Sequence, residues 1–149
     1  MDSNILIHKV IYNDFHGVIT DKSVVSFNNC SIEVDSIWDT GSARSFISDK
    51  VIKTLKLKPQ GTDFVIGVKD IYPCELYDIN IQVFDNILYS IQAKSFTRTP
   101  KRPFDLLIGM DIIYKGSFSL GFENGKYSLC FKYDLMSGFT KVTSSSLNS

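Results

Sequence analysis

Ile37-Trp38-Asp39-Thr40-Gly41-Ser42-Ala43 is the stretch that decides how this 149-residue chain folds. An apolar run delivers the carboxylate of Asp39 into a tight turn, where small residues follow at once. Gly41 lets the backbone bend sharply and lets another group approach, because glycine has no Cβ. The hydroxyls of Thr40 and Ser42 can hydrogen-bond the backbone or the carboxylate and so fix its orientation. Because Asp, Thr and Gly are also ordinary turn residues, the triplet by itself fits either a reactive acid or a simple Asx turn.

A second motif lies further along the chain, where the apolar run Leu106-Leu107-Ile108 ends at Gly109, seventy residues after Asp39. Together the two motifs resemble those of the retropepsin-like aspartic proteases, the half-size relatives of the pepsins, over roughly Val24 to Lys132. The resemblance implies a mostly β fold, a retropepsin-like acid-protease half-barrel with one lobe per chain and one or two short helices. It also implies that Ile108 and Gly109 pack behind the active-site turn, with a short helix after them.

The same resemblance assigns a role to each residue of the first motif. Asp39 would be the catalytic carboxylate of an aspartic endopeptidase, which hydrolyses peptide bonds in protein or peptide substrates. Thr40 would bond across a dimer axis and brace two turns, the Gly41 amide would approach the carboxylate, and Ser42 would hydrogen-bond its outer oxygen. An inactive relative would have no need to keep these four residues together.

A single aspartate is not enough for this chemistry. One carboxylate must accept a proton from the attacking water while a second, protonated one polarises the scissile carbonyl, and two carboxylates about 3 Å apart share one proton. The chain has a single Asp-Thr-Gly and is too short for two lobes. We therefore expect an isologous homodimer that pairs Asp39 of both copies as the dyad. Such a dyad activates water without a metal or other cofactor.

Residues Thr62 to Val83 carry two β-rich runs joined across Gly67-Val68-Lys69-Asp70. By position they resemble the family's flap, the hairpin that closes over a bound peptide, and this assigns Ile66, Gly67 and Val68 to substrate binding. Retroviral flaps are rich in glycine at the tip, whereas this one offers only Gly67. An ordinary sheet hairpin therefore stays open as the alternative.

The residues also bear on three other functions. A retropepsin-fold module without protease activity, used for dimerisation or peptide binding, stays open because a fold does not settle function. A serine hydrolase is poorly supported, since the chain has no G-x-S-x-G and only two histidines. The loop from Thr97 to Pro103 carries three cations but is too short, and too poor in aromatic residues, for a nucleic-acid patch. We interpret it as a solvated loop and leave acidic-substrate contact as the alternative.

The composition is that of a globular domain without a large net charge. Sixteen basic residues balance sixteen acidic ones, so neither nucleic acid nor an anionic membrane is indicated as a partner. No stretch approaches the roughly 18 apolar residues of a membrane span, and the first residues lack the pattern of a signal peptide. Three cysteines without C-x-x-C spacing favour buried free thiols over a disulfide framework or a zinc site. We expect a cytoplasmic protein.

Local signals place the remaining elements. Residues 1–22 are expected to form an N-terminal leader with an edge strand, 23–134 the protease domain, and 135–149 a disordered tail. Ser48 is a natural N-cap for a helix over Ser48 to Leu57, which Pro59 and Gly61 would end. Asn-Asn at 28–29 and Asn-Gly at 124–125 predict hairpin turns.

Overall fold

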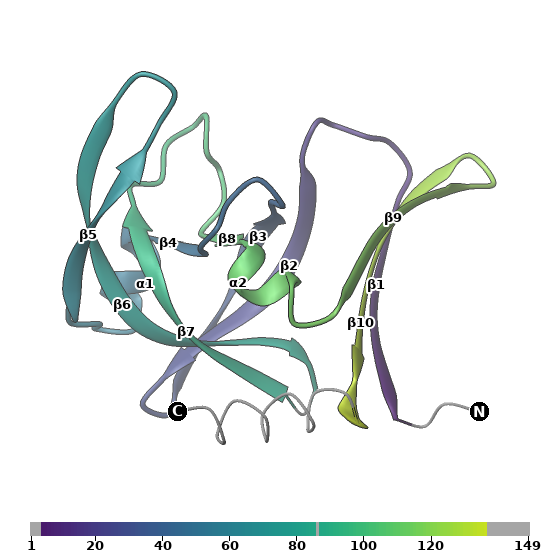
Figure 1. Cartoon of the computed structure of the whole chain (residues 1–149), viewed down its shortest axis with the longest axis horizontal. Coiled ribbons are helices and arrows are strands. Elements are labelled where there is room, and N and C mark those ends of the chain that lie inside the picture. The colour runs from purple at the N-terminus through teal and green to yellow at the C-terminus, as the bar shows by residue number, and fades with distance from the viewer. Residues whose placement is uncertain (1–3, 86, 137–149) are drawn as a thin grey trace. The chain divides into compact units, whose positions relative to one another are not determined.

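The computed structural model describes residues 4–85 and 87–136, which form two compact units. One unit spans 18–112, and the other joins the N-terminal segment to the chain after residue 112. The first unit is mostly β-sheet with two short helices, as the sequence predicts, and the second helix runs one residue past its end (Figure 1). The elements of this unit are β2 Ile19–Phe27, β3 Cys30–Trp38, β4 Phe46–Ser48, α1 Asp49–Thr54, β5 Gly61–Ile66, β6 Ile71–Phe84, β7 Ile87–Phe96, β8 Leu106–Ile108 and α2 Met110–Ile113.

The seven strands of this unit form one sheet in the order β2-β3-β8-β4-β7-β6-β5. Strand β2 also pairs with β6, from Val24↔Gln82 to Ser26↔Asn80, so the sheet curls back on itself as a partial barrel. The long strand β6 makes this possible, because one end pairs with β5 while the other reaches β2. Most pairs are antiparallel, but β3 with β8 and β4 with β7 run parallel.

The first hairpin forms as the sequence predicts. Strands β2 and β3 are joined by Asn28 and Asn29, whose φ angles of 48° and 65° are both positive. A two-residue hairpin loop needs this conformation because its twist then matches that of the strands, and asparagine tolerates it better than most residues. The buried face of this hairpin includes Val25 and Val34.

Helix α1 begins where the sequence predicts but ends earlier. The Ser48 hydroxyl accepts a hydrogen bond from the Val51 amide at 3.4 Å, which confirms the N-cap. The helix stops at Thr54 instead of continuing to Leu57, because Lys56 turns into the left-handed region with a φ of 51°. The chain therefore leaves the helix before Pro59, and the proline is not the residue that ends it.

The core of this unit collects the apolar residues that alternate along its strands. Each fully buried aliphatic side chain contributes about 1.5–3 kcal/mol relative to exposure. The motif around Gly109 supplies several of them, so the same sequence that positions the site also closes the core. The completely buried aliphatic residues are Val25, Ile47, Val51, Ile81, Leu106, Ile108 and Ile112.

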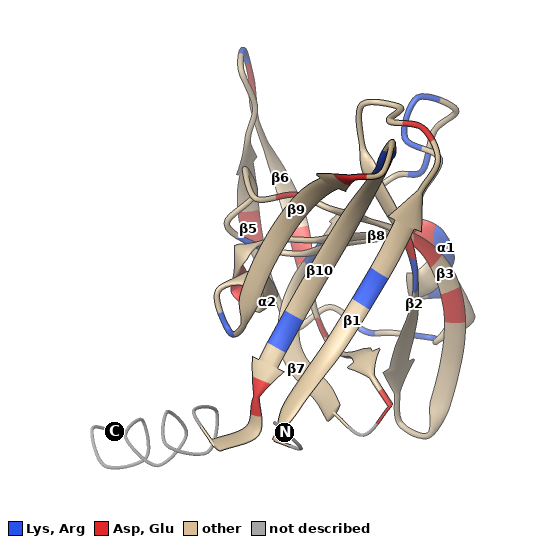
Figure 2. Cartoon of the chain, turned by 90° about the vertical axis from the view of Figure 1, so that its right-hand side faces the viewer, with Lys and Arg blue, Asp and Glu red and all other residues tan. Residues whose placement is uncertain are grey.

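The second unit is a three-stranded antiparallel sheet in the order β1-β10-β9, which Figure 2 shows with β10 between its neighbours. The predicted edge strand at the N-terminus is confirmed. Asn124 and Gly125, with φ angles of 53° and 76°, form the predicted hairpin turn. Of the predicted disordered tail, all but the first two residues lie outside the described part of the chain. The strands are β1 Ile5–Tyr12, β9 Ser117–Glu123 and β10 Lys126–Asp134.

Two further expectations concern cysteines and membranes. Only Cys74 of the three thiols is buried; Cys130 is half-buried, and Cys30 is exposed because it begins β3 directly after the hairpin turn. The prediction of three buried thiols was therefore right for Cys74, wrong for Cys30 and only partly right for Cys130. Within the described residues, no helix has the length and apolar character needed to cross a membrane.

Candidate active site

The two sequence motifs meet because β3 and β8 lie side by side. They pair in parallel, with Trp38 opposite Ile108, so each strand delivers its next residue to the same edge. The Asp39 amide donates a hydrogen bond to the Ile108 carbonyl at 2.9 Å, which extends the pairing by one residue. Asp39 and Gly109 therefore follow directly on two buried, neighbouring strands.

The turn after Asp39 holds both its carboxylate and its carbonyl through backbone amides. The Gly41 amide donates to Asp39 Oδ1 at 2.8 Å, and the Ser42 amide donates to the Asp39 carbonyl at 3.3 Å. A Cβ on Gly41 would lie 3.1 Å from Oδ1, so a side chain there would crowd the carboxylate. The Asp39 side chain is half-buried and Thr40 is exposed. The acid thus has a fixed orientation and an open side.

Ser42 makes a different contact from the expected one. Its hydroxyl donates to the Arg44 carbonyl at 2.7 Å and not to the outer oxygen of Asp39. A hydroxyl carries one proton, so within this single chain it cannot donate to both. Ser42 instead braces the far end of the turn, where its own carbonyl accepts from the Met110 amide at 2.7 Å.

Gly109 lies where no side chain fits. A Cβ built on it would be 2.5 Å from the Arg44 carbonyl oxygen and 2.8 Å from the Ser42 carbonyl oxygen. These contacts are to backbone atoms, which cannot rotate away. Gly109 therefore lets the segment after β8 pack directly against the turn that carries Asp39, as expected from the sequence.

A second carboxylate supports this packing from α2. Asp111 Oδ1 accepts from the Ser45 hydroxyl at 2.7 Å, and Oδ2 accepts from the Ser45 amide at 2.9 Å. The Ser45 oxygen in turn accepts from the Gly109 amide at 3.0 Å. Asp111 lies in the first turn of α2, where an acid can cap its own helix, but its carboxylate binds the segment after the Asp39 turn. Ser45 carried no signal in the sequence.

Asp105, just before β8, is the most deeply buried acid of the unit, with 2% of its surface exposed. It accepts from the Ser48 hydroxyl and from Arg98 Nη1, both at 2.8 Å. Its backbone amide donates to the Asp35 carbonyl at 2.9 Å. One carboxylate thereby joins the start of α1 and the loop after β7 to the strand that leads to Gly109.

The candidate flap is a regular hairpin of β5 and β6. Ile66 pairs with Ile71, and the Gly67 amide donates to the Asp70 carbonyl at 2.7 Å, which closes the turn. Ile66 and Val68 are fully exposed, so the tip offers apolar side chains to solvent.

The base of this hairpin is tied to β7 by a cation. Lys94 Nζ donates to the Phe64 carbonyl at 2.7 Å and lies 3.8 Å from Asp63 Oδ2. The hydrogen bond from the Phe64 amide lowers the pKa of Asp63, and the charges of Lys94 and Arg44 act in the same direction. The hairpin is therefore anchored at its base and free at its tip.

The arrangement presents one oriented carboxylate at the edge of a buried pair of strands. Among the described residues, the Asp39 carboxylate accepts a hydrogen bond from Gly41 alone, so its remaining oxygen sites are available. The described residues contain no group of three or more His, Cys, Asp or Glu side chains that could hold a metal ion. Chemically, one such group can act as a general base or, paired with a second carboxyl group, as half of an acid–base dyad.

Comparison with known proteins identifies the fold. No family model matches the sequence, and neither does any curated protein. The crystal structure of a retropepsin-like aspartic protease from Rickettsia conorii covers 87% of this chain and 95% of its own, with a TM-score of 0.55 and 13% identity. That of the retroviral protease-like domain of Ddi1 from Leishmania major covers 68% and 81%, with a TM-score of 0.44 and 13% identity. The chain has a retropepsin-like fold with a single lobe.

Proposed function

We propose that this chain is an aspartic endopeptidase whose active site forms between two copies, with Asp39 of each copy as the catalytic dyad. The observation that carries the proposal is the position of Asp39. It follows a buried strand, its carboxylate is held by the Gly41 amide at 2.8 Å, and its side chain is only half-buried. An intact turn of this kind around one carboxylate, on a single-lobed retropepsin-like fold, is half of an acid-protease site.

In the proposed reaction, the dyad holds one proton between its two carboxyl groups. The ionised Asp39 takes a proton from a water molecule, which attacks the scissile carbonyl while the protonated carboxyl group donates to the carbonyl oxygen. The proton taken from water then passes to the leaving nitrogen as the carbon–nitrogen bond breaks, and a hydroxyl group of the tetrahedral intermediate returns a proton to the other carboxylate, so that the dyad again holds one proton. Thr40 is exposed at the edge of the turn, and in the proposed dimer it would bond across the two-fold axis.

Substrate binding is assigned to the β5–β6 hairpin. Ile66, Gly67 and Val68 lie at or next to its tip, and the exposed apolar side chains of the two larger residues would be covered when a peptide lies beneath them. Closure of such a hairpin excludes water and holds the peptide backbone. The single glycine of this tip limits its movement compared with a glycine-rich one.

The test is cleavage of a diverse peptide pool by the wild-type chain and by Asp39→Asn, scanned across pH. Replacing a general base costs about 10²–10⁴-fold in rate, so we expect cleavage to vanish while the fold and the dimer persist. Wild-type activity should be highest on the acid side of neutrality, where the dyad keeps its proton. Pepstatin-like inhibitors should block it.

The matched control is Asp78→Asn, which makes the same chemical change at an exposed position on β6. It should cleave as the wild type does. Turnover retained by Asp39→Asn would exclude the dyad. A wild-type dimer that cleaves nothing across the pH range would instead favour the alternative, a retropepsin-fold module for dimerisation or peptide binding.

A further inference from the structure

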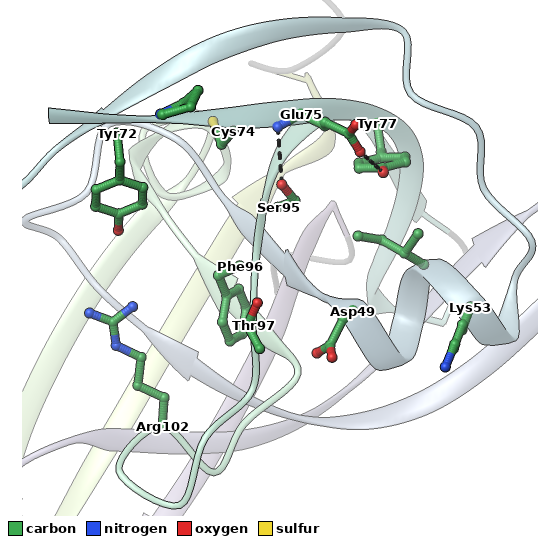
Figure 3. A pocket seen from close by; sticks show the side chains of 12 residues that line it. Asp49, Lys53, Tyr72, Cys74, Glu75, Tyr77, Ser95, Phe96, Thr97 and Arg102 are labelled. Carbon is green, nitrogen blue, oxygen red and sulfur yellow. Dashed lines mark hydrogen bonds between the residues drawn. The ribbon is translucent and has the colours of Figure 1, made fainter.

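A concave site lies within the 18–112 unit, between the β5–β6 hairpin and the loop after β7. It is an open pocket of about 580 Å³ whose wall is formed by β6, by the end of β7 and by α1 (Figure 3). The function proposed above does not use it. The side chains that matter to its chemistry are Asp49, Lys53, Tyr72, Glu75, Phe96 and Arg102.

The acidic groups of this pocket already have donors. Glu75 accepts a hydrogen bond from the Tyr77 hydroxyl. Burial, helped by this hydrogen bond and by the charge of Glu75, raises the pKa of Tyr77 to about 12, so the tyrosine stays protonated and keeps donating. Asp49 Oδ1 accepts from the Arg98 amide at 3.0 Å. Neither carboxylate therefore depends on a ligand for a partner.

Two donor groups of the pocket, by contrast, have no acceptor among the residues that the structure describes. Within the described chain, the Arg102 guanidinium and the Tyr72 hydroxyl form no hydrogen bond or ion pair. Figure 3 shows these two groups pointing toward one another from the loop and from β6. Arg98 in the same loop differs, because it is paired with the buried Asp105. The pocket can thus donate hydrogen bonds to a negatively charged oxygen group of a ligand.

Local contacts order the backbone that carries Arg102 and one aromatic residue of the pocket wall. The Arg102 amide donates to the Thr99 carbonyl at 2.9 Å, so the turn that carries the guanidinium is closed. Phe96, which lines the same pocket, packs against Phe104 with ring centroids 5.3 Å apart. An aromatic ring and a guanidinium in one pocket suit a ligand with both a carboxylate and an apolar part.

We propose that this pocket binds an acidic side chain of an extended peptide, with Arg102 receiving the carboxylate in bidentate fashion and Tyr72 adding a hydrogen bond. Phe96 and Tyr72 take a neighbouring apolar side chain of the same peptide. A peptide is the expected ligand because the pocket borders β6, a strand of the hairpin that would cover a substrate. The choice of a peptide as the ligand therefore rests on the proposed function. The pocket then selects substrates that are acidic outside the scissile bond.

The test is direct binding, which does not require turnover. Two short fluorescein-labelled peptides, identical except for a central Phe-Glu or Phe-Gln, are titrated against the Asp39→Asn chain and followed by fluorescence anisotropy. We expect the Phe-Glu peptide to bind about five- to tenfold more tightly, because a charge-assisted pair is lost with glutamine. The difference should shrink at high salt.

Two variants locate the effect. Arg102→Gln should abolish the preference for Phe-Glu, and Tyr72→Phe should reduce it while keeping the ring. Lys101→Gln is the matched control, since it removes the same charge from the same loop but does not line the pocket. Melting temperatures of all variants should stay close together because these side chains are exposed.

Each outcome decides one of the two proposals. Equal binding of both peptides, or an equal loss of preference with Lys101→Gln and Arg102→Gln, would overturn the acidic subsite. Cleavage by the wild type with no acidic preference would do so as well and would leave the protease standing. Acid-selective binding that depends on Arg102, without any cleavage by the wild type, would support the pocket and remove the protease.

Discussion

Gly109 fixes the position of the reactive acid without a side chain of its own. The Arg44 and Ser42 carbonyls leave no room for a Cβ on it, so the segment between β8 and α2 rests directly on the Asp39 turn. Its amide is held by Ser45, whose own hydroxyl proton goes to Asp111. The orientation of Asp39 thus depends on backbone packing behind it more than on polar side chains beside it.

Gly109→Ala tests this dependence. The added methyl group meets backbone oxygen at 2.5 Å, so the turn and the strand must move apart. We expect a loss of about 1–3 kcal/mol in the free energy of unfolding, as for other overpacked sites, together with a drop in cleavage. Urea denaturation followed by fluorescence gives the first quantity.

Gly61→Ala is the control for that substitution. Its Cβ would lie 3.7 Å from a Leu76 methyl group, which is an ordinary contact, and Gly61 is exposed at the start of β5. The stability change there should stay within about 0.5 kcal/mol. If both variants lost the same stability, the close approach at Gly109 would not be what holds the turn.

At the scale of elements, the parts set by neighbouring residues could be predicted from the sequence. The Asn28–Asn29 and Asn124–Gly125 turns require positive φ angles, and the Ser48 cap needs only the first turn of its own helix. The contacts that support the site could not be predicted in this way. Asp111 meets Ser45 across 66 positions of the chain, and no local pattern marks either residue.

Asp105 is the second such contact. Its carboxylate joins α1 through Ser48, 57 positions away, and the β7–β8 loop through Arg98. No Thr-Gly turn follows Asp105, so its local sequence marks neither a catalytic nor a structural role. The local sequence does not reveal that Asp105 is buried, where its carboxylate forms a junction between α1, the β7–β8 loop and β8.

Asp105→Asn should loosen that junction. The asparagine oxygen can still accept one hydrogen bond, from Ser48 or from Arg98. The partly exposed Arg98 loses its charged partner, and the new amide NH₂ group is buried opposite a donor rather than an acceptor. We expect a loss of about 1–3 kcal/mol in the free energy of unfolding, measured by urea denaturation. Asp78→Asn, at an exposed position, should change stability by less than about 0.5 kcal/mol. Equal effects of the two substitutions would contradict a structural role for Asp105.

At the scale of the whole molecule, the chain supplies one retropepsin-like lobe and one Asp-Thr-Gly. It also exposes apolar surface in the 4–17 and 113–136 unit. There the rings of Phe15 and Phe122 both pack on Tyr127, with centroids 5.8 and 4.9 Å from it, while all three remain exposed. Contiguous exposed apolar groups of this kind are typical of surfaces that associate. Both features fit the homodimer proposed above.

The proposed dimer predicts a loss of activity on dilution. A monomer owns one of the two carboxylates, so activity per chain should fall as the concentration drops below the dimer dissociation constant. Cleavage of a fixed peptide, measured over a dilution series together with the mass of the particle by light scattering, checks this. The two transitions should coincide. Full activity in a particle with the mass of one chain would exclude a shared site.

Mixing the wild type with Asp39→Asn tests the shared active site without dilution of the protein. In a two-fold dimer that exchanges subunits freely, equal amounts give about a quarter of dimers with two intact carboxylates. Because the total number of dimers has doubled, cleavage should fall to about half that of the wild type alone. Asp78→Asn, added in the same amount, forms fully competent dimers and should not lower it. Cleavage unaffected by added Asp39→Asn would mean that each chain works alone, and the second carboxylate would then have to come from within the same copy.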